Sequence, residues 1–137
     1  MNIWSKGSTL ALSVAVVSCS TEADEVDAGP PPTLFEQVQT SVFRRHCAAA
    51  PCHDMVEPGG ELSLTPNEAY GELVNVPAAQ DPGLLRVTPG DPSASYLWIK
   101  LGSGPFADGV RMPSGEPTLP DEDLSLIREW IEAGALP

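Results

Sequence analysis

The sequence predicts an all-α domain on three observations. Three segments open with residues that cap helices and a fourth opens with acids after a proline, and the first and last of the four carry apolar side chains at helical spacing. No segment shows the sustained period-two alternation of a half-buried strand. The chain has 137 residues, of which 12 are Gly and 15 are Pro. We therefore expect one small domain of about four helices joined by long Pro/Gly-rich loops.

The first two helices are predicted from capping residues. Thr33 followed by Glu36 forms a capping box, and the first helix is expected to run to about Cys47. Its apolar stripe consists of Leu34, Phe35, Val38, Val42 and Phe43. The run Thr65-Pro66-Asn67-Glu68 combines an N-cap, a proline at the first helical position and a capping-box acid. It predicts a second helix through about Val74.

The third and fourth helices repeat these signals. Asp91 before Pro92 predicts a helix from Pro92 to Leu101, which Gly102 ends. The last helix is expected from about Pro120 to Gly134, with three acids in its first turn, where the helix dipole favours anions. Its apolar face consists of Leu124, Ile127, Trp130 and Ile131.

The charge of the chain excludes two classes of partner. Seven Lys and Arg residues stand against 19 Asp and Glu, a formal charge of −12. Nucleic-acid binders gain affinity from Lys and Arg that neutralise phosphates, and these few cations cannot form such a surface. Binding to anionic lipid headgroups is excluded for the same reason. A partner protein is expected to be basic where it docks.

The first 32 residues read as export and attachment signals. Residues 1–18 carry Lys6 as their only charge, followed by a short apolar run, as in a secretory signal peptide. Val16-Val17-Ser18-Cys19 resembles a bacterial lipobox, in which Cys19 is lipidated; Cys19 could instead be an incidental thiol beside an ordinary cleavage site. Residues 19–32 are acidic and Pro-rich, which predicts a tether. Residues 33–137 then form the domain. We expect it on the periplasmic side of the cell envelope, and the residue after Cys19 is Ser20 rather than Asp, which favours the outer membrane.

The motif that carries chemistry is Cys47-x4-Cys52-His53, at the end of the first helix. Two thiols followed directly by a histidine attach c-type haem, because the thiols add to the vinyl groups and the imidazole binds the iron. The spacing of four residues is a less frequent variant of the usual two. Two alternatives stay open, a Cys47–Cys52 disulfide in an exported protein and a zinc site that lacks a fourth ligand.

Met112 is the candidate for the second axial ligand. The chain has three methionines; Met1 leaves with the signal, and Met55 lies two residues after His53. Met112 is 59 residues beyond His53 (112 − 53), enough chain to reach the opposite haem face. Pro113 after it favours an extended backbone at Met112. Met112 could also be an ordinary core residue that fills a gap.

The chain resembles small c-type cytochrome domains, particularly the lipoprotein-attached monohaem versions of myxobacteria and planctomycetes. The resemblance covers nearly all of residues 34–136. It is carried by Phe43 to His53, Gly59-Gly60-Glu61-Leu62, Tyr70 to Pro77, Pro89-Gly90-Asp91-Pro92 with Ser95-Tyr96-Leu97, Met112-Pro113-Ser114-Gly115, and Ile127 to Ala135.

The resemblance implies a cytochrome c-like fold with one covalent haem c. It makes Cys47 and Cys52 the haem thioethers, His53 the proximal iron ligand and Met112 the distal one. It also implies that the first and last helices cross, with Phe43 meeting the Trp130 side of the last helix.

A porphyrin needs apolar walls, and its propionates need hydrogen-bond donors or cations. Candidate walls are Leu62, Leu64, Leu97, Trp98, Ile99 and Phe106. Candidate propionate donors are Tyr96, Trp98, Lys100 and Arg111, although solvated surface positions suit Lys100 and Arg111 equally well.

These residues predict an electron carrier rather than an enzyme, since no nucleophile and base pair or second metal set is present in the sequence. An open distal site would instead allow peroxidase-like chemistry. The alternative function is a haem-free, cytochrome-like lipoprotein that acts as an interaction or structural module with a Cys47–Cys52 disulfide.

Overall fold

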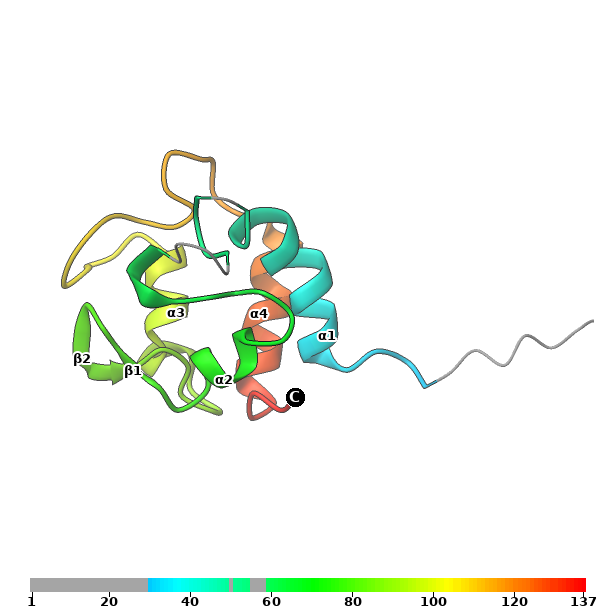
Figure 1. Ribbon diagram of the computed structural model, residues 1–137. Coiled ribbons are helices and arrows are strands. Elements are labelled where there is room, and N and C mark those ends of the chain that lie inside the picture. Colours follow the sequence, from blue (N-terminus) through cyan, green and yellow to red (C-terminus); the bar gives the residue numbers. More distant parts are fainter. Residues whose placement is uncertain (1–29, 50, 55–58) are drawn as a thin grey trace, which may run out of the picture.

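The computed structural model describes residues 30–49, 51–54 and 59–137. The predicted signal peptide, the lipobox with Cys19 and most of the tether lie outside the described residues. The described part has an α-helical core flanked by a small hairpin and long loops (Figure 1). Among these residues no helix is both long enough and apolar enough to cross a bilayer.

The first helix begins with the predicted capping box. The Thr33 hydroxyl accepts a hydrogen bond from the Glu36 N–H at 3.2 Å, and the Glu36 carboxylate accepts one from the Thr33 N–H at 2.7 Å. α1 (Leu34–Val38) continues directly into the π-helix η1 (Gln39–Cys47). At the end of η1 the Ala48 N–H donates to the Phe43 carbonyl, five residues back, at 2.7 Å. The helix ends at Cys47, as predicted, but most of its length is π rather than α.

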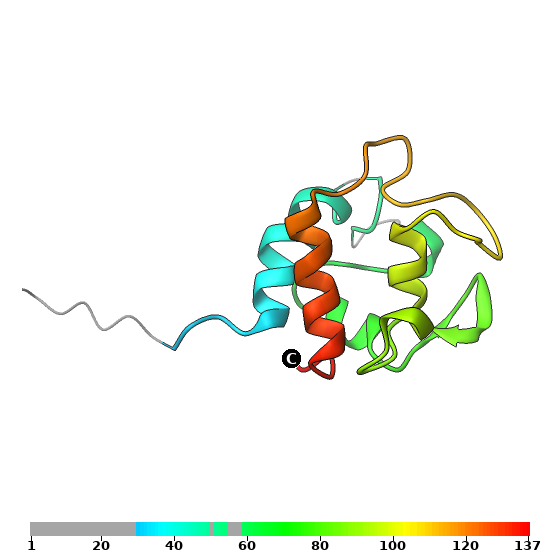
Figure 2. The same ribbon diagram turned by 180° about the vertical axis from the view of Figure 1, so that it is seen from behind.

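The last helix, α4 (Asp121–Glu132), packs against the first helix, and the two lie side by side in both ribbon views (Figures 1 and 2). The ring centroid of Phe35 is 5.3 Å from that of Trp130 and 5.2 Å from that of Tyr70. Phe43 is fully buried in the same cluster. The indole N–H of Trp130 donates to the Leu136 carbonyl at 2.8 Å, which holds the C-terminal turn against α4.

The second helix is shorter than predicted. α2 spans Ala69–Leu73, and residues 66–68 form a turn instead of a first helical turn. The Thr65 carbonyl accepts from both the Glu68 N–H at 3.1 Å and the Ala69 N–H at 2.9 Å, which closes this turn. The N-cap of α2 is Glu68, which makes no side-chain capping hydrogen bond, so the cap predicted at Thr65 is wrong.

The third helix is broken where one continuous helix was expected. A 3-10 turn, η3 (Pro92–Ala94), is capped by the Asp91 carboxylate, which accepts from the Ala94 N–H at 3.1 Å. α3 starts only at Tyr96 and ends at Leu101. Between them Ser95 is extended, because its buried hydroxyl donates to the Asp91 carbonyl and accepts from the Thr88 N–H.

A two-stranded antiparallel sheet, β1 (Pro77–Ala78) and β2 (Asp81–Leu85), links α2 to α3. Pro77 pairs with Leu85 and Ala78 with Asp81, with an irregularity between the two pairs. The hairpin is a strand element in a chain predicted to be all-α. Strands this short, with Pro and Gly inside β2, leave no room for the alternation that reveals strands in a sequence.

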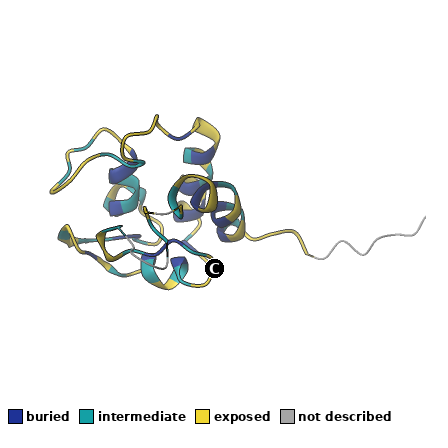
Figure 3. Cartoon of the chain, turned by 45° about the horizontal axis from the view of Figure 1, so that its top comes forward, coloured by how far each residue is buried: buried dark blue, intermediate teal, exposed yellow. Residues whose placement is uncertain are grey.

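The buried side chains lie where α1, η1 and α4 face one another and face the loops around α2 and α3 (Figure 3). The largest fully buried ones are Trp130, Phe43, Leu73, Ile127 and Ile131. Most of the core lies between the first helix and α4, which are far apart in the sequence. This packing therefore holds the two ends of the domain together.

We expect Ile127→Ala to lower the free energy of unfolding by about 2–5 kcal/mol, since Ile127 is fully buried and the change leaves a cavity. Leu136→Ala is the control, because that side chain is 66% exposed and the loss should stay within about 0.5 kcal/mol. Denaturant unfolding of the full chain measures both changes. Equal effects of the two substitutions would contradict this core assignment.

Candidate functional site

The predicted Cys-Cys-His motif turns back on itself at the end of η1. The His53 N–H donates to the Cys47 carbonyl at 3.1 Å, and the Cys52 N–H donates to the Ala49 carbonyl at 2.6 Å. The first of these bonds joins the two ends of the motif. Cys47 and His53 are therefore neighbours through their backbones, although five residues separate them.

The imidazole of His53 is fixed by the segment that follows the motif. Its Nδ1 lies 2.9 Å from the Leu62 carbonyl oxygen. A carbonyl can only accept, so in the neutral ring Nδ1 carries the proton and Nε2 keeps its lone pair. The Leu64 N–H also donates to the His53 carbonyl at 2.9 Å. The ring and the backbone of His53 are thus both held by residues 62–64.

Gly59 lies directly against this motif. Its N–H donates to the Cys52 carbonyl at 2.6 Å. A Cβ at Gly59 would lie 3.0 Å from that same oxygen and 3.7 Å from the Cε1 of His53. The close backbone approach therefore requires glycine at this position.

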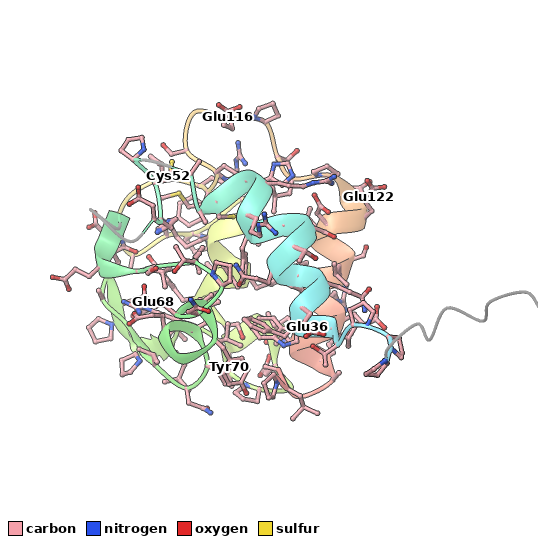
Figure 4. The ribbon with its side chains drawn as sticks, turned by 45° about the vertical axis from the view of Figure 1, so that its right-hand side comes forward. Glu36, Cys52, Glu68, Tyr70, Glu116 and Glu122 are labelled. Carbon is pink, nitrogen blue, oxygen red and sulfur yellow. The ribbon has the colours of Figure 1, made fainter. Side chains whose placement is uncertain are left out.

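The two thiols have different surroundings. Both cysteines are free in the structure; Cys47 is half-buried and Cys52 is exposed, as the label in Figure 4 places it at the edge of the molecule. Burial raises the pKa of the Cys47 thiol to about 12, with smaller contributions from the negative charges of Cys52 and Asp123. Cys47 is therefore a protonated, apolar-facing thiol at neutral pH.

Met112 lies in the long loop between α3 and α4. Its side chain is half-buried and packs against the core, and its N–H donates to the Lys100 carbonyl at 2.8 Å. The Arg111 guanidinium bonds the carbonyls of Met112, at 3.3 Å, and Glu116, at 2.7 Å. Glu116 and Cys52 both lie at the upper end of the molecule in Figure 4. Arg111 is thus used to shape the loop that carries Met112.

Lys100 is buried, which the sequence did not reveal. Only 6% of the residue is exposed, and its ammonium donates to the Asp108 carbonyl at 3.2 Å. The ammonium nitrogen lies 4.9 Å from the ring centroid of Phe106 and 5.9 Å from that of Tyr96. Burial lowers the pKa of Lys100. Its place is under the Met112 loop, so the solvated surface position considered from the sequence is wrong.

Tyr96 has a buried hydroxyl without a hydrogen-bond partner in the described part of the chain. The residue is 5% exposed, and burial raises the pKa of its phenol, which therefore stays a neutral donor. A buried donor without an acceptor is costly, so this hydroxyl is suited to a bound group that accepts a hydrogen bond.

The predicted wall residues divide between the core and its edge. Leu64 is 2% exposed and belongs to the core proper. Leu62, Leu97 and Trp98 are half-buried and pack against the core from outside, as Met112 does. Ile99 and Phe106 are also half-buried. A partly exposed apolar set of this kind offers a surface that a flat apolar group could cover.

His46, next to the motif, pairs with α4 instead of pointing to the site. Its Nε2 lies 3.2 Å from the Asp123 carboxylate. A surface hollow beside this pair is lined by Asp123 together with Ser41 and Arg45, and its lining does not include His53 or Met112. Among residues 30–49, 51–54 and 59–137, no group of three or more His, Cys, Asp or Glu is placed to hold a metal ion.

No family model matches the chain, and no curated protein and no solved structure is found similar to it.

We expect Gly59→Ala to lower the free energy of unfolding by about 1–3 kcal/mol, because the added methyl presses on the Cys52 carbonyl. Gly71→Ala is the matched control. Gly71 lies inside α2 with nothing within 4 Å of its Cβ position, so that change should stabilise the chain by about 0.5–1 kcal/mol. Denaturant unfolding that gave both variants the same sign would contradict the close packing at Gly59.

Proposed function

We propose that this protein is a monohaem c-type cytochrome that carries single electrons in the cell envelope. The observation that supports it most is the hydrogen bond from the His53 Nδ1 to the Leu62 carbonyl. Iron-ligating histidines donate their second ring N–H to a carbonyl or carboxylate, which fixes the tautomer and leaves Nε2 for the metal. His53 has this arrangement, and it directly follows a free thiol at Cys52.

The chemistry of the residues present fits a covalent haem. Cys47 and Cys52 supply two thiols that are not bonded to one another, and His53 supplies a ring whose Nδ1 is already used by the Leu62 carbonyl, which makes Nε2 the nitrogen suited to the iron. Met112 supplies a thioether at the edge of the core. The half-buried Leu62, Leu97 and Trp98 supply apolar wall, and the unpartnered Tyr96 hydroxyl is a donor suited to a propionate.

The bound haem would supply one-electron chemistry, and the residues of this chain would supply its ligands and its apolar surroundings. His53 and Met112 would be the residues that ligate its iron. A thioether ligand favours the reduced state and raises the potential, which suits a carrier. Cys52 is exposed, so a partner protein could approach the molecule from this side.

The acidity of the chain bears on its partners. Cleavage before Cys19 would remove Lys6 and no acid, which leaves 6 − 19 = −13. A redox partner would then dock through a basic surface, and association would slow as salt screens the attraction. Attachment through lipidated Cys19, at the periplasmic face of the outer membrane, belongs to the same proposal and rests on the sequence alone.

Expression with c-type maturation machinery should give a protein with one covalent haem, seen as a Soret band and as an intact mass increased by one haem. We expect Cys47→Ala together with Cys52→Ala to lose the covalent attachment. Cys19→Ala is the control, since it should keep the haem and lose only the lipid. An intact mass two hydrogens below that of the free thiols, without a Soret band, would favour the haem-free module with a disulfide.

Met112→Ala tests the distal ligand. We expect altered visible spectra in both redox states and a lower midpoint potential, because the thioether that favours reduced iron is removed. Met55→Ala is the matched control, as the only other methionine downstream of the predicted signal. Spectra of Met112→Ala that equal those of the parent would rule Met112 out and leave an open distal site.

A further inference from the structure

The segment from Glu61 to Leu64 holds His53 at two points. The Leu62 carbonyl faces the ring Nδ1 at 2.9 Å, and the Leu64 N–H donates to the His53 carbonyl at 2.9 Å. The segment is neither helix nor strand over residues 62–64, so no ladder of backbone hydrogen bonds fixes its position. Its position comes from the packing of Leu62 and Leu64 against the core and from the hydrogen bonds at its two ends.

Each end of this segment is held by a buried polar side chain. The Arg86 guanidinium, in a residue 9% exposed, donates to the Glu61 carbonyl at 3.1 Å. The Gln39 amide, in a residue 5% exposed, donates from Nε2 to the Leu64 carbonyl at 2.9 Å. Gln39 is 25 residues away in sequence and starts the π-helix η1, whose other end is Cys47.

We propose that Gln39 is a positioning residue for His53. It ties the segment that fixes the imidazole to the helix that carries Cys47, so the ring nitrogen and the first thiol share one rigid frame. The proposal rests on the proposed function in taking His53 as the iron ligand. Gln39 acts on His53 through the Leu64 carbonyl, which its amide bonds at 2.9 Å.

Stability alone does not explain an amide at position 39. The Gln39 Oε1 is buried and has no hydrogen-bond partner among the described residues, which costs free energy. A methionine of similar length would fill the same volume without that unpaired oxygen, at the expense of leaving the Leu64 carbonyl without its donor. The unpaired oxygen lowers stability and the bond to Leu64 raises it, so the two effects of the amide on stability oppose each other. The main role of the Gln39 amide is therefore to orient residues 62–64.

The test compares Gln39→Met with Gln37→Met in the full chain, prepared with c-type maturation machinery and labelled with ¹⁵N-histidine. Gln37 is a matched control on the same helix, since its amide donates to the Pro32 carbonyl at 3.0 Å, away from His53. NMR measures the hydrogen exchange rate of the His53 ring N–H in the reduced state. This rate reports the ring's bond to Leu62 when it is compared with the exchange of backbone N–H groups in the same variant, because a general loss of stability accelerates all of them together.

We expect exchange about fivefold faster in Gln39→Met, the effect of weakening one ordinary hydrogen bond. The redox equilibrium should also shift toward reduced iron, because a weaker bond at Nδ1 makes the imidazole a poorer donor. Gln37→Met should leave both measurements unchanged. If Gln39→Met does not fold, Gln39→Asn keeps an amide that is one methylene too short to reach Leu64 and is expected to give the same acceleration.

Equal exchange rates in the Gln39 variant and the Gln37 variant would overturn the proposal. A protein without haem would overturn the proposed function separately. In the haem-free protein, NMR can still measure the exchange rate of the His53 ring N–H and the tautomer of the ring. The role of Gln39 is therefore tested with or without haem.

Discussion

The packing of the first helix against α4 is the constraint on which the other parts of the structure depend. Phe35 and Trp130 are in ring contact, and Phe43 and Ile127 are fully buried beside them. This contact joins two helices that lie about 90 residues apart in the sequence, and it does not depend on the conformation of the loops between them. With the helix so fixed, its C-terminal residue, Cys47, has a defined place, and the motif that follows starts from a rigid point.

The site is built outward from that contact by side chains that bond to backbone carbonyls. Gln39 and Arg86 hold the segment before α2, and that segment holds His53. On the other side, Lys100 and Arg111 bond carbonyls of the loop that carries Met112. Loops without regular structure are thus located by a few long polar side chains, three of which would ordinarily be solvated cations.

The helix starts were predicted in part. The Thr33 box and the Asp91 cap are present. The cap predicted at Thr65 is wrong, because α2 begins after Glu68, which makes no side-chain capping hydrogen bond. The break at Ser95, the π-helix and the short hairpin were missed. Ser95 is held by hydrogen bonds to Asp91 and Thr88, which lie close in the sequence but form no pattern that marks the end of a helix. In the candidate site the titratable and sulfur-bearing residues could be named from the sequence. The carbonyl of Leu62 could not, because a backbone acceptor has no sequence signature.

The π-helix has a consequence for how the chain tolerates insertions and deletions. In η1 the hydrogen bonds reach five residues back, so the helix contains more residues per turn than an α-helix of the same height. Each residue contributes about 100° of rotation in an α-helix. Removing one residue between Gln39 and Cys47 would let the segment rewind as α-helix and would turn Cys47 around the axis, while Phe35 stayed in the core. The number of residues in this stretch, and not only their polarity, therefore sets the direction in which the first thiol points.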